Sequence, residues 1–234
     1  MNLITKASTP MSDYVAGARG IIHSIAIEIV DIKSRVEEMH KIVTDTSWLE
    51  PLNIINSTTY AARSEPSINK IVNDILSKVE DEISTDFGEY LISDTAQTAL
   101  KEHMTHIRLP LAELIKEKIS GNPGFDFHTE CPNNFVIFGE AKYSGVSNSH
   151  GKALSQINDF ILAKKDLQEL SDIQHFVSAL AINKVPSGGK SFCAAFSIIS
   201  DDINGIMNNA LNSEFMPTLL CHEAIYLIGV RVNA

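Results

Sequence analysis

The sequence predicts an α/β protein in which a central mixed β-sheet is flanked by helices. Some segments, such as residues 67–84, repeat apolar residues at three- and four-residue spacing, which is typical of an amphipathic helix. Others are short runs rich in β-branched residues. The clearest is residues 224–232 (AIYLIGVRV), which indicates a strand buried on both faces. With 234 residues, of which 44% are hydrophobic, the chain can form one large globular core.

Residues 1–84 are predicted to be a mainly helical region that packs on the rest of the chain. We expect residues 1–20 to be partly irregular, because glycines interrupt any helix there. Residues 20–43 combine strand-like alternation with helical spacing, which indicates a short strand that runs into a helix. Residues 44–66, rich in Asn, Ser, Thr and Pro, are expected to be a long connection, and residues 67–84 a helix.

Residues 85–234 are predicted to be the core, beginning with a helix over residues 85–104. Glu89 shares a face of this helix with mostly apolar residues, and a carboxylate on such a face is costly to bury unless it is paired or bound to a metal. Glu89 is therefore either near a metal site or half-exposed near the helix N-terminus, where the helix dipole stabilises it. A further helix is predicted over residues 111–119.

The most informative stretch is residues 124–145, which read GFDFHTECPNNFVIFGEAKYSG. It predicts two short strands joined by a three-residue loop, Pro132-Asn133-Asn134, because Asn tolerates the left-handed conformation that closes such a loop. In the resulting register Asp126 lies opposite Glu140, and Lys142 follows on the same face. Two carboxylates and an amine on one patch indicate a divalent-metal site. The alternative is a surface hairpin whose charges face water.

The remaining elements are predicted to complete the sheet around this hairpin. Residues 144–151 form a polar loop, and residues 152–171 an amphipathic helix that carries Lys152 and Gln156 near its start. Lys152 adds positive charge that could contact a phosphate backbone. Beyond the helix, apolar runs predict strands and one short helix, in the following order: 176–182 (strand), 192–200 (strand), 201–211 (helix) and 224–232 (strand).

Asp126, followed by Glu140-x-Lys142 on the next strand, resembles the PD-(D/E)xK superfamily of restriction and repair nucleases, with Phe125 where the family's name places proline. The resemblance implies a restriction-endonuclease-like core and metal-dependent hydrolysis of DNA phosphodiester bonds. Asp126, Glu140 and Lys142 would be the catalytic residues.

The same resemblance implies a set of binding residues. Asp126, Glu140, the carbonyl of Ala141 and Glu89 would bind Mg²⁺ or Mn²⁺ through oxygen ligands. Nucleases of this superfamily often carry a glutamine on the helix after the Glu-x-Lys strand. Gln156 is therefore a candidate for a substrate contact, with an ordinary surface glutamine as the alternative.

The net charge of −10 is unusual for a protein that binds nucleic acid, because such binding depends on Lys and Arg side chains that neutralise phosphates. We therefore expect a larger partner protein to hold the DNA. In size and in its GEAKY motif the chain resembles the family of nuclease subunits of bacterial Hachiman anti-phage systems, which pair with a helicase. The alternatives are a stand-alone type II restriction endonuclease and a non-catalytic, nuclease-like adaptor.

The sequence gives no indication of a membrane segment. No apolar run approaches the roughly 18 residues that a transmembrane helix needs. The first ten residues, MNLITKASTP, have neither the apolar core nor the cleavage pattern of a signal peptide. We therefore expect a cytoplasmic protein.

Overall fold

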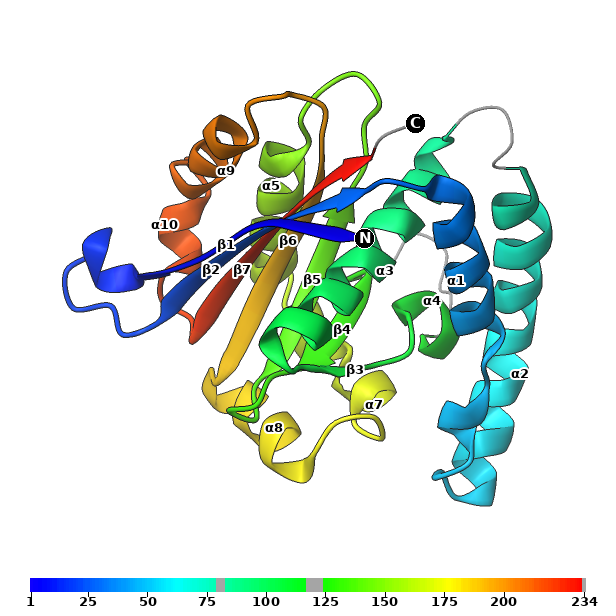
Figure 1. The fold of residues 1–234 in the computed structure, drawn as a ribbon. Coiled ribbons are helices and arrows are strands. Elements are labelled where there is room, and N and C mark those ends of the chain that lie inside the picture. Colours follow the sequence, from blue (N-terminus) through cyan, green and yellow to red (C-terminus); the bar gives the residue numbers. More distant parts are fainter. Residues whose placement is uncertain (79–82, 117–123, 233–234) are drawn as a thin grey trace.

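The computed structural model describes residues 1–78, 83–116 and 124–232. Within these ranges one mixed seven-stranded sheet has helices on both faces, which confirms the predicted α/β class (Figure 1). Its strands are β1 (Asn2–Pro10), β2 (Ile21–Ile29), β3 (Ile107–Arg108), β4 (Phe127–Glu130), β5 (Val136–Lys142), β6 (Lys190–Ile198) and β7 (Ala224–Val232). They are ordered β1-β2-β7-β6-β5-β4-β3 across the sheet.

Neighbouring strands β2, β7, β6 and β5 are parallel, whereas β1, β4 and β3 pair antiparallel at the two sides. The central strands are buried almost throughout: eight of the nine residues of β6 and seven of the nine of β7 are buried. This matches the prediction that residues 224–232 form a strand covered on both faces.

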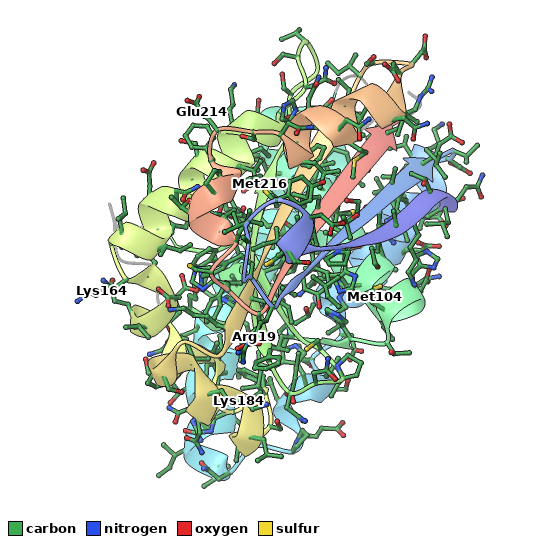
Figure 2. The ribbon with its side chains drawn as sticks, turned by 90° about the vertical axis from the view of Figure 1, so that its left-hand side faces the viewer. Arg19, Met104, Lys164, Lys184, Glu214 and Met216 are labelled. Atoms are coloured by element: carbon green, nitrogen blue, oxygen red, sulfur yellow. The ribbon has the colours of Figure 1, made fainter. Side chains whose placement is uncertain are left out.

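The helices lie on the two sides of the sheet. They are α1 (Ile32–Thr44), α2 (Ile54–Lys70), α3 (Thr85–Met104), α4 (Ala112–Ile115), α5 (His150–Leu162), α6 (Lys165–Gln168), α7 (Leu170–Ile173), α8 (Ala179–Lys184), α9 (Ile203–Leu211) and α10 (Met216–Leu219). Figure 2 shows α3, which ends at Met104, on one side of the strands and α10 with Met216 on the other. No helix in the described ranges has both the length and the hydropathy to cross a bilayer.

The N-terminal region begins with a strand, where we expected irregular structure. β1 pairs antiparallel with β2, and β2 pairs in parallel with β7 over nine positions. Most side chains of β1 are exposed because it lies at the edge of the sheet, so its sequence lacks the alternation of a half-buried strand. The first 84 residues therefore supply two strands of the sheet as well as helices.

The expected connection over residues 44–66 is largely the helix α2. Asn53 caps this helix by accepting a hydrogen bond from the Asn56 N–H at 2.9 Å, and Pro66 lies inside it. A π-helical segment, Ile71–Ile75, continues the chain. The prediction was wrong because it treated Pro66 as a boundary. Part of the predicted helix, residues 79–82, lies outside the described residues.

Other predicted elements agree with the structure to different degrees. The helix over residues 85–104 is α3, and Ser84 caps it by accepting from the Phe87 N–H at 3.2 Å. The helix predicted from residue 152 is α5, which ends at Leu162 and is followed by short helices. The run 176–182, predicted to be a strand, leads instead into α8. Of the helix predicted over residues 111–119, residues 117–119 lie outside the described chain.

Candidate active site

The loop between β4 and β5 has the predicted conformation. The Cys131 N–H donates to the Phe135 carbonyl at 3.0 Å, and the Asn134 N–H donates to the Cys131 carbonyl at 2.9 Å. Asn134 adopts a left-handed conformation with φ of 55°, which Asn tolerates better than most residues. The turn therefore fixes the register of the hairpin.

This register brings the two predicted acids together. Phe127 pairs with Gly139, so Asp126, one residue earlier, faces Glu140 across the hairpin. The Asp126 N–H donates to the Gly139 carbonyl at 2.9 Å. The Asp126 carboxylate accepts a hydrogen bond from the Ala141 N–H at 2.8 Å, which holds its side chain against β5.

Lys142 connects this hairpin to α3. Its Nζ lies 2.7 Å from Oε1 of Glu140 and 3.5 Å from Oε1 of Glu89. The Glu140 side chain is fully buried, whereas those of Lys142 and Glu89 are 17% and 36% exposed. Four of the predicted site residues (Asp126, Glu140, Lys142 and Glu89) therefore lie around the same end of β5.

A glycine allows α3 to approach this end of the strand. A Cβ atom at Gly88 would overlap the ring of Tyr143, which directly follows β5. The absence of a side chain at Gly88 therefore lets the helix pack close enough for Glu89 to reach Lys142. The sequence contains this signal as Phe-Gly-Glu, with the glycine directly before the candidate ligand.

Glu140 has one oxygen that the protein does not satisfy. Its Oε1 accepts from Lys142, but Oε2 is buried and has no hydrogen-bond partner among the residues that the structure describes. Burial, and then the nearby carboxylate of Asp126, raise the pKa of Glu140 well above its ordinary value. An ionised Glu140 in this position is costly unless a further positive charge, such as a cation, lies next to Oε2.

The other two groups show the same electrostatic coupling. Burial raises the pKa of Asp126 to about 6, against the opposing effects of Lys142 and the Ala141 N–H. Burial alone would lower the pKa of Lys142, but Glu140 and Asp126 outweigh it and raise this pKa above its ordinary value. Lys142 is therefore a fixed positive charge at neutral pH, and the two acids compete for it.

The two predicted substrate contacts lie on the α5 side of Lys142. Lys152 and Gln156 line, together with Lys142, a surface depression of about 570 Å³. Asp126 and Glu89 instead line a smaller pocket of about 160 Å³. The remaining residues around this smaller pocket are Lys70, Asp86, Tyr90, Ser93, Leu111 and Glu113.

Three further residues, Glu169, Lys116 and His128, form a cluster beside Asp126 whose contacts the sequence does not predict. Oε1 of Glu169 accepts from the Phe125 N–H at 2.9 Å and from Lys116 Nζ at 2.7 Å, and its Oε2 lies 2.8 Å from Nε2 of His128. No local pattern connects these residues, because 41 and 53 positions separate Glu169 from His128 and Lys116.

The residues present suit a hard cation with few protein ligands. In the described ranges, no group of three or more His, Cys, Asp or Glu residues is arranged to hold a metal. Mg²⁺, however, usually takes one or two carboxylates and completes its shell with water and substrate phosphate. Asp126 and Glu140, with its unsatisfied Oε2, supply two carboxylates of that kind, and the expected main-chain ligand Ala141 lies beside them with its N–H bonded to Asp126. No protein-family model and no curated protein matches the chain.

Proposed function

We propose that this chain is a metal-dependent nuclease that hydrolyses DNA phosphodiester bonds. The observation that carries the proposal is the pairing of Asp126 with Glu140 across one hairpin, with Lys142 Nζ 2.7 Å from Glu140 and with a buried Glu140 oxygen that lacks a partner in the described chain. Buried carboxylates with raised pKa values beside a fixed amine are typical of a reactive site.

Each residue has a chemical role in this proposal. Asp126, Glu140 and the Ala141 carbonyl hold Mg²⁺ or Mn²⁺, and Glu89 assists them from α3. The bound ion supplies positive charge that stabilises the phosphate during hydrolysis. Lys142 remains protonated because of its acidic neighbours, and it stabilises negative charge that develops in the transition state. Lys152 and Gln156, which share a depression with Lys142, contact the DNA.

The proposal includes a restriction-endonuclease-like core. Its support is the order of elements around the site: α3 with Glu89 precedes the hairpin β4–β5, and α5 with Gln156 follows it. Asp126 lies directly before β4, while Glu140 and Lys142 lie at the end of β5, so the candidate residues meet at one end of the sheet.

The biological role that fits best is that of the effector subunit of a bacterial anti-phage complex with a helicase, acting in the cytoplasm. The net charge of −10 supports a partner, because the chain itself offers few cations to hold a DNA backbone. A stand-alone type II restriction endonuclease is the alternative role for a chain with the same DNA-cleaving activity. It would need a DNA-recognition surface of its own.

A non-catalytic adaptor is the second candidate. It is favoured by the absence, in the part of the chain that the structure describes, of a three-residue metal-binding group. In that case the buried acids would be retained only as part of the fold.

Cleavage of plasmid DNA distinguishes these functions. We expect the protein, purified with and without the partner that co-purifies from its host, to cut plasmid in Mg²⁺ and to lose the activity in EDTA. Lys142→Ala should lower cleavage by about 100-fold or more, because it removes a charge aimed at the transition state. Its circular dichroism spectrum should stay that of the wild type. Equal cleavage by this variant would refute the assignment, and a helicase in stoichiometric amount would support the defence role.

A further inference from the structure

Glu169 lies between α6 and α7, far from the hairpin in sequence, yet its carboxylate contacts the residues on both sides of Asp126. Oε1 accepts from the main-chain N–H of Phe125, one residue before Asp126, at 2.9 Å. Oε2 lies 2.8 Å from the ring of His128, two residues after Asp126. Only 5% of Glu169 is exposed, and His128 is fully buried.

We propose that Glu169 is a positioning residue for Asp126, which it holds in place by restraining the chain on both sides of that residue. The inference rests on the nuclease function proposed above, in which Asp126 is a ligand of the cation. Glu169 acts on Asp126 through the two groups that its carboxylate contacts, the main-chain N–H of Phe125 and the side chain of His128.

Asp126 needs such support because it lies at the end of a short strand. β4 has four residues, and on one side it pairs with only two residues of β3. The first residues of such a strand open more easily than its middle. Asp126 itself is tied to β5 by its hydrogen bonds with Gly139 and Ala141, and to α4 by the Ala112 N–H, which donates to its carbonyl at 3.2 Å. Glu169, which lies outside the hairpin, adds restraints on Phe125 and His128 at either side of Asp126.

The chemistry of the cluster explains why a carboxylate occupies this position. Three donors converge on it: the Phe125 N–H, Lys116 Nζ and the His128 ring. An ionised carboxylate only accepts hydrogen bonds, and it has enough lone pairs for all three. Lys116 also donates to the Phe125 carbonyl, so both the N–H and the carbonyl of Phe125 are hydrogen-bonded within the cluster.

Charge and space in the cluster fit an ionised Glu169. Burial alone would raise the pKa of Glu169, but the hydrogen bond from His128 and the charge of Lys116 hold it below its ordinary value. Gly124 leaves room for the carboxylate, because a Cβ atom there would overlap Oε1. The close approach of Glu169 to the chain before β4 therefore depends on this glycine.

Paired substitutions separate positioning from simple stabilisation. Glu169→Ala removes all three acceptor contacts, whereas Glu169→Gln keeps the size and can still accept from Phe125. The matched control is Glu130→Ala at the other end of β4, since Glu130 is also buried and accepts from the N–H and the hydroxyl of Ser178 at 2.7 and 2.6 Å. Each variant is prepared as the full chain with its co-purifying partner.

The first measurement is plasmid cleavage as a function of Mg²⁺ and Mn²⁺ concentration, together with the melting temperature. We expect Glu169→Ala to lower kcat or raise the half-maximal metal concentration about 10- to 100-fold, as loss of support behind a metal ligand generally does. Glu169→Gln should recover most of the activity. Glu130→Ala should melt at a lower temperature but cut within about threefold of wild type. If Glu130→Ala loses as much activity as Glu169→Ala at a similar melting temperature, the positioning role is refuted.

Hydrogen–deuterium exchange of the main-chain amides of residues 124–128 decides the inference independently of nuclease activity. Faster exchange at Phe125 and Asp126 in Glu169→Ala, but not in Glu130→Ala, supports the restraint. If Glu169→Ala shows this faster exchange but the wild type never cuts DNA, the positioning role stands and the proposed function fails. Unchanged exchange in Glu169→Ala refutes the positioning role, even if the wild type is an active nuclease.

Discussion

At the scale of single residues, Glu140 places a fully buried carboxylate at the end of a central strand. One oxygen is bonded to Lys142, and the other has no partner within the described ranges of the chain. Its pKa is raised by burial and by Asp126, so the folded protein resists its ionisation. Such a group lowers the stability of the metal-free protein, and proteins retain such groups most often where function requires them.

We therefore predict that Glu140→Gln stabilises the metal-free protein while it removes activity. The pKa of Glu140 is higher in the folded than in the unfolded chain. At pH values above its ordinary pKa of 4.5, ionisation of Glu140 therefore lowers the free energy of unfolding. Below that pH both states are protonated and the penalty disappears. The free energy of unfolding of the variant should be about 1–2 kcal/mol higher at pH 8. In a protein of this size, each kcal/mol raises the melting temperature by about 2–4 °C.

Thermal melts at pH 4.5, 6 and 8 without divalent metal measure this difference. We expect the gain in melting temperature of Glu140→Gln to grow steadily with pH. Addition of Mn²⁺ should raise the melting temperature of the wild type but not that of the variant, because only the wild type binds the ion. A variant that is less stable than the wild type at pH 8 would show that Glu140 stabilises the fold.

The sequence predicts some of these residues and not others, for a physical reason. Asp126 lies opposite Glu140 because of a local turn, in which Asn134 sets the register of a short hairpin. The contacts of Glu169 depend on how α6 and α7 pack against the hairpin. No periodicity or turn residue in the sequence predicts that packing.

At the scale of elements, the distance between α3 and the end of β5 determines whether Glu89 reaches Lys142. We predict that Gly88→Ala costs about 1–3 kcal/mol of stability, because the added methyl overlaps Tyr143 and forces the helix and strand apart. The same variant should lower plasmid cleavage, since the Glu89–Lys142 contact of 3.5 Å lengthens.

Gly151→Ala in α5 is the matched control, because nothing lies within 4 Å of the position of its added Cβ. Alanine favours helix over glycine, so this variant should be as stable as the wild type or up to about 1 kcal/mol more stable. Chemical denaturation of both variants provides the comparison. Equal stabilities for the two would mean that the close contact at Gly88 is not rigid.

Elements are predictable where one physical signal dominates. The helix α3 has a side-chain cap at Ser84 and a continuous buried face, and its predicted span is the observed one. The edge strand β1 has no such signal because it is largely exposed. The helix α2 has a side-chain cap at Asn53, but Pro66 within it argues against a helix. In both cases tertiary packing determines the structure, and local sequence preferences do not predict it.

At the scale of the whole molecule, one sheet joins the N-terminal region to the site. β2 pairs with β7 over nine positions, and β1 covers the other edge of β2 (Figure 1). Removal of residues 1–84 would leave the buried strand β7 at the edge of the sheet, with main-chain N–H and carbonyl groups that no longer pair with β2. We therefore predict that a chain of residues 85–234 does not fold alone, although the site residues all lie within it.

Expression of residues 85–234, followed by circular dichroism and thermal melting, tests this. We expect aggregation or a spectrum without a cooperative transition. A truncated chain that melts cooperatively and cuts plasmid would show that the N-terminal strands are an addition to an independent nuclease core.

The most direct test of the cation site is an anomalous-scattering map from crystals of the protein soaked in Mn²⁺. We predict a peak about 2.0–2.3 Å from an oxygen of Asp126 and from Oε2 of Glu140, at the donor set that the hairpin brings together. Crystals of Glu140→Gln grown and soaked in the same way should lack the peak. A map with no Mn²⁺ at these carboxylates, or with Mn²⁺ bound only elsewhere, would contradict the metal-dependent mechanism.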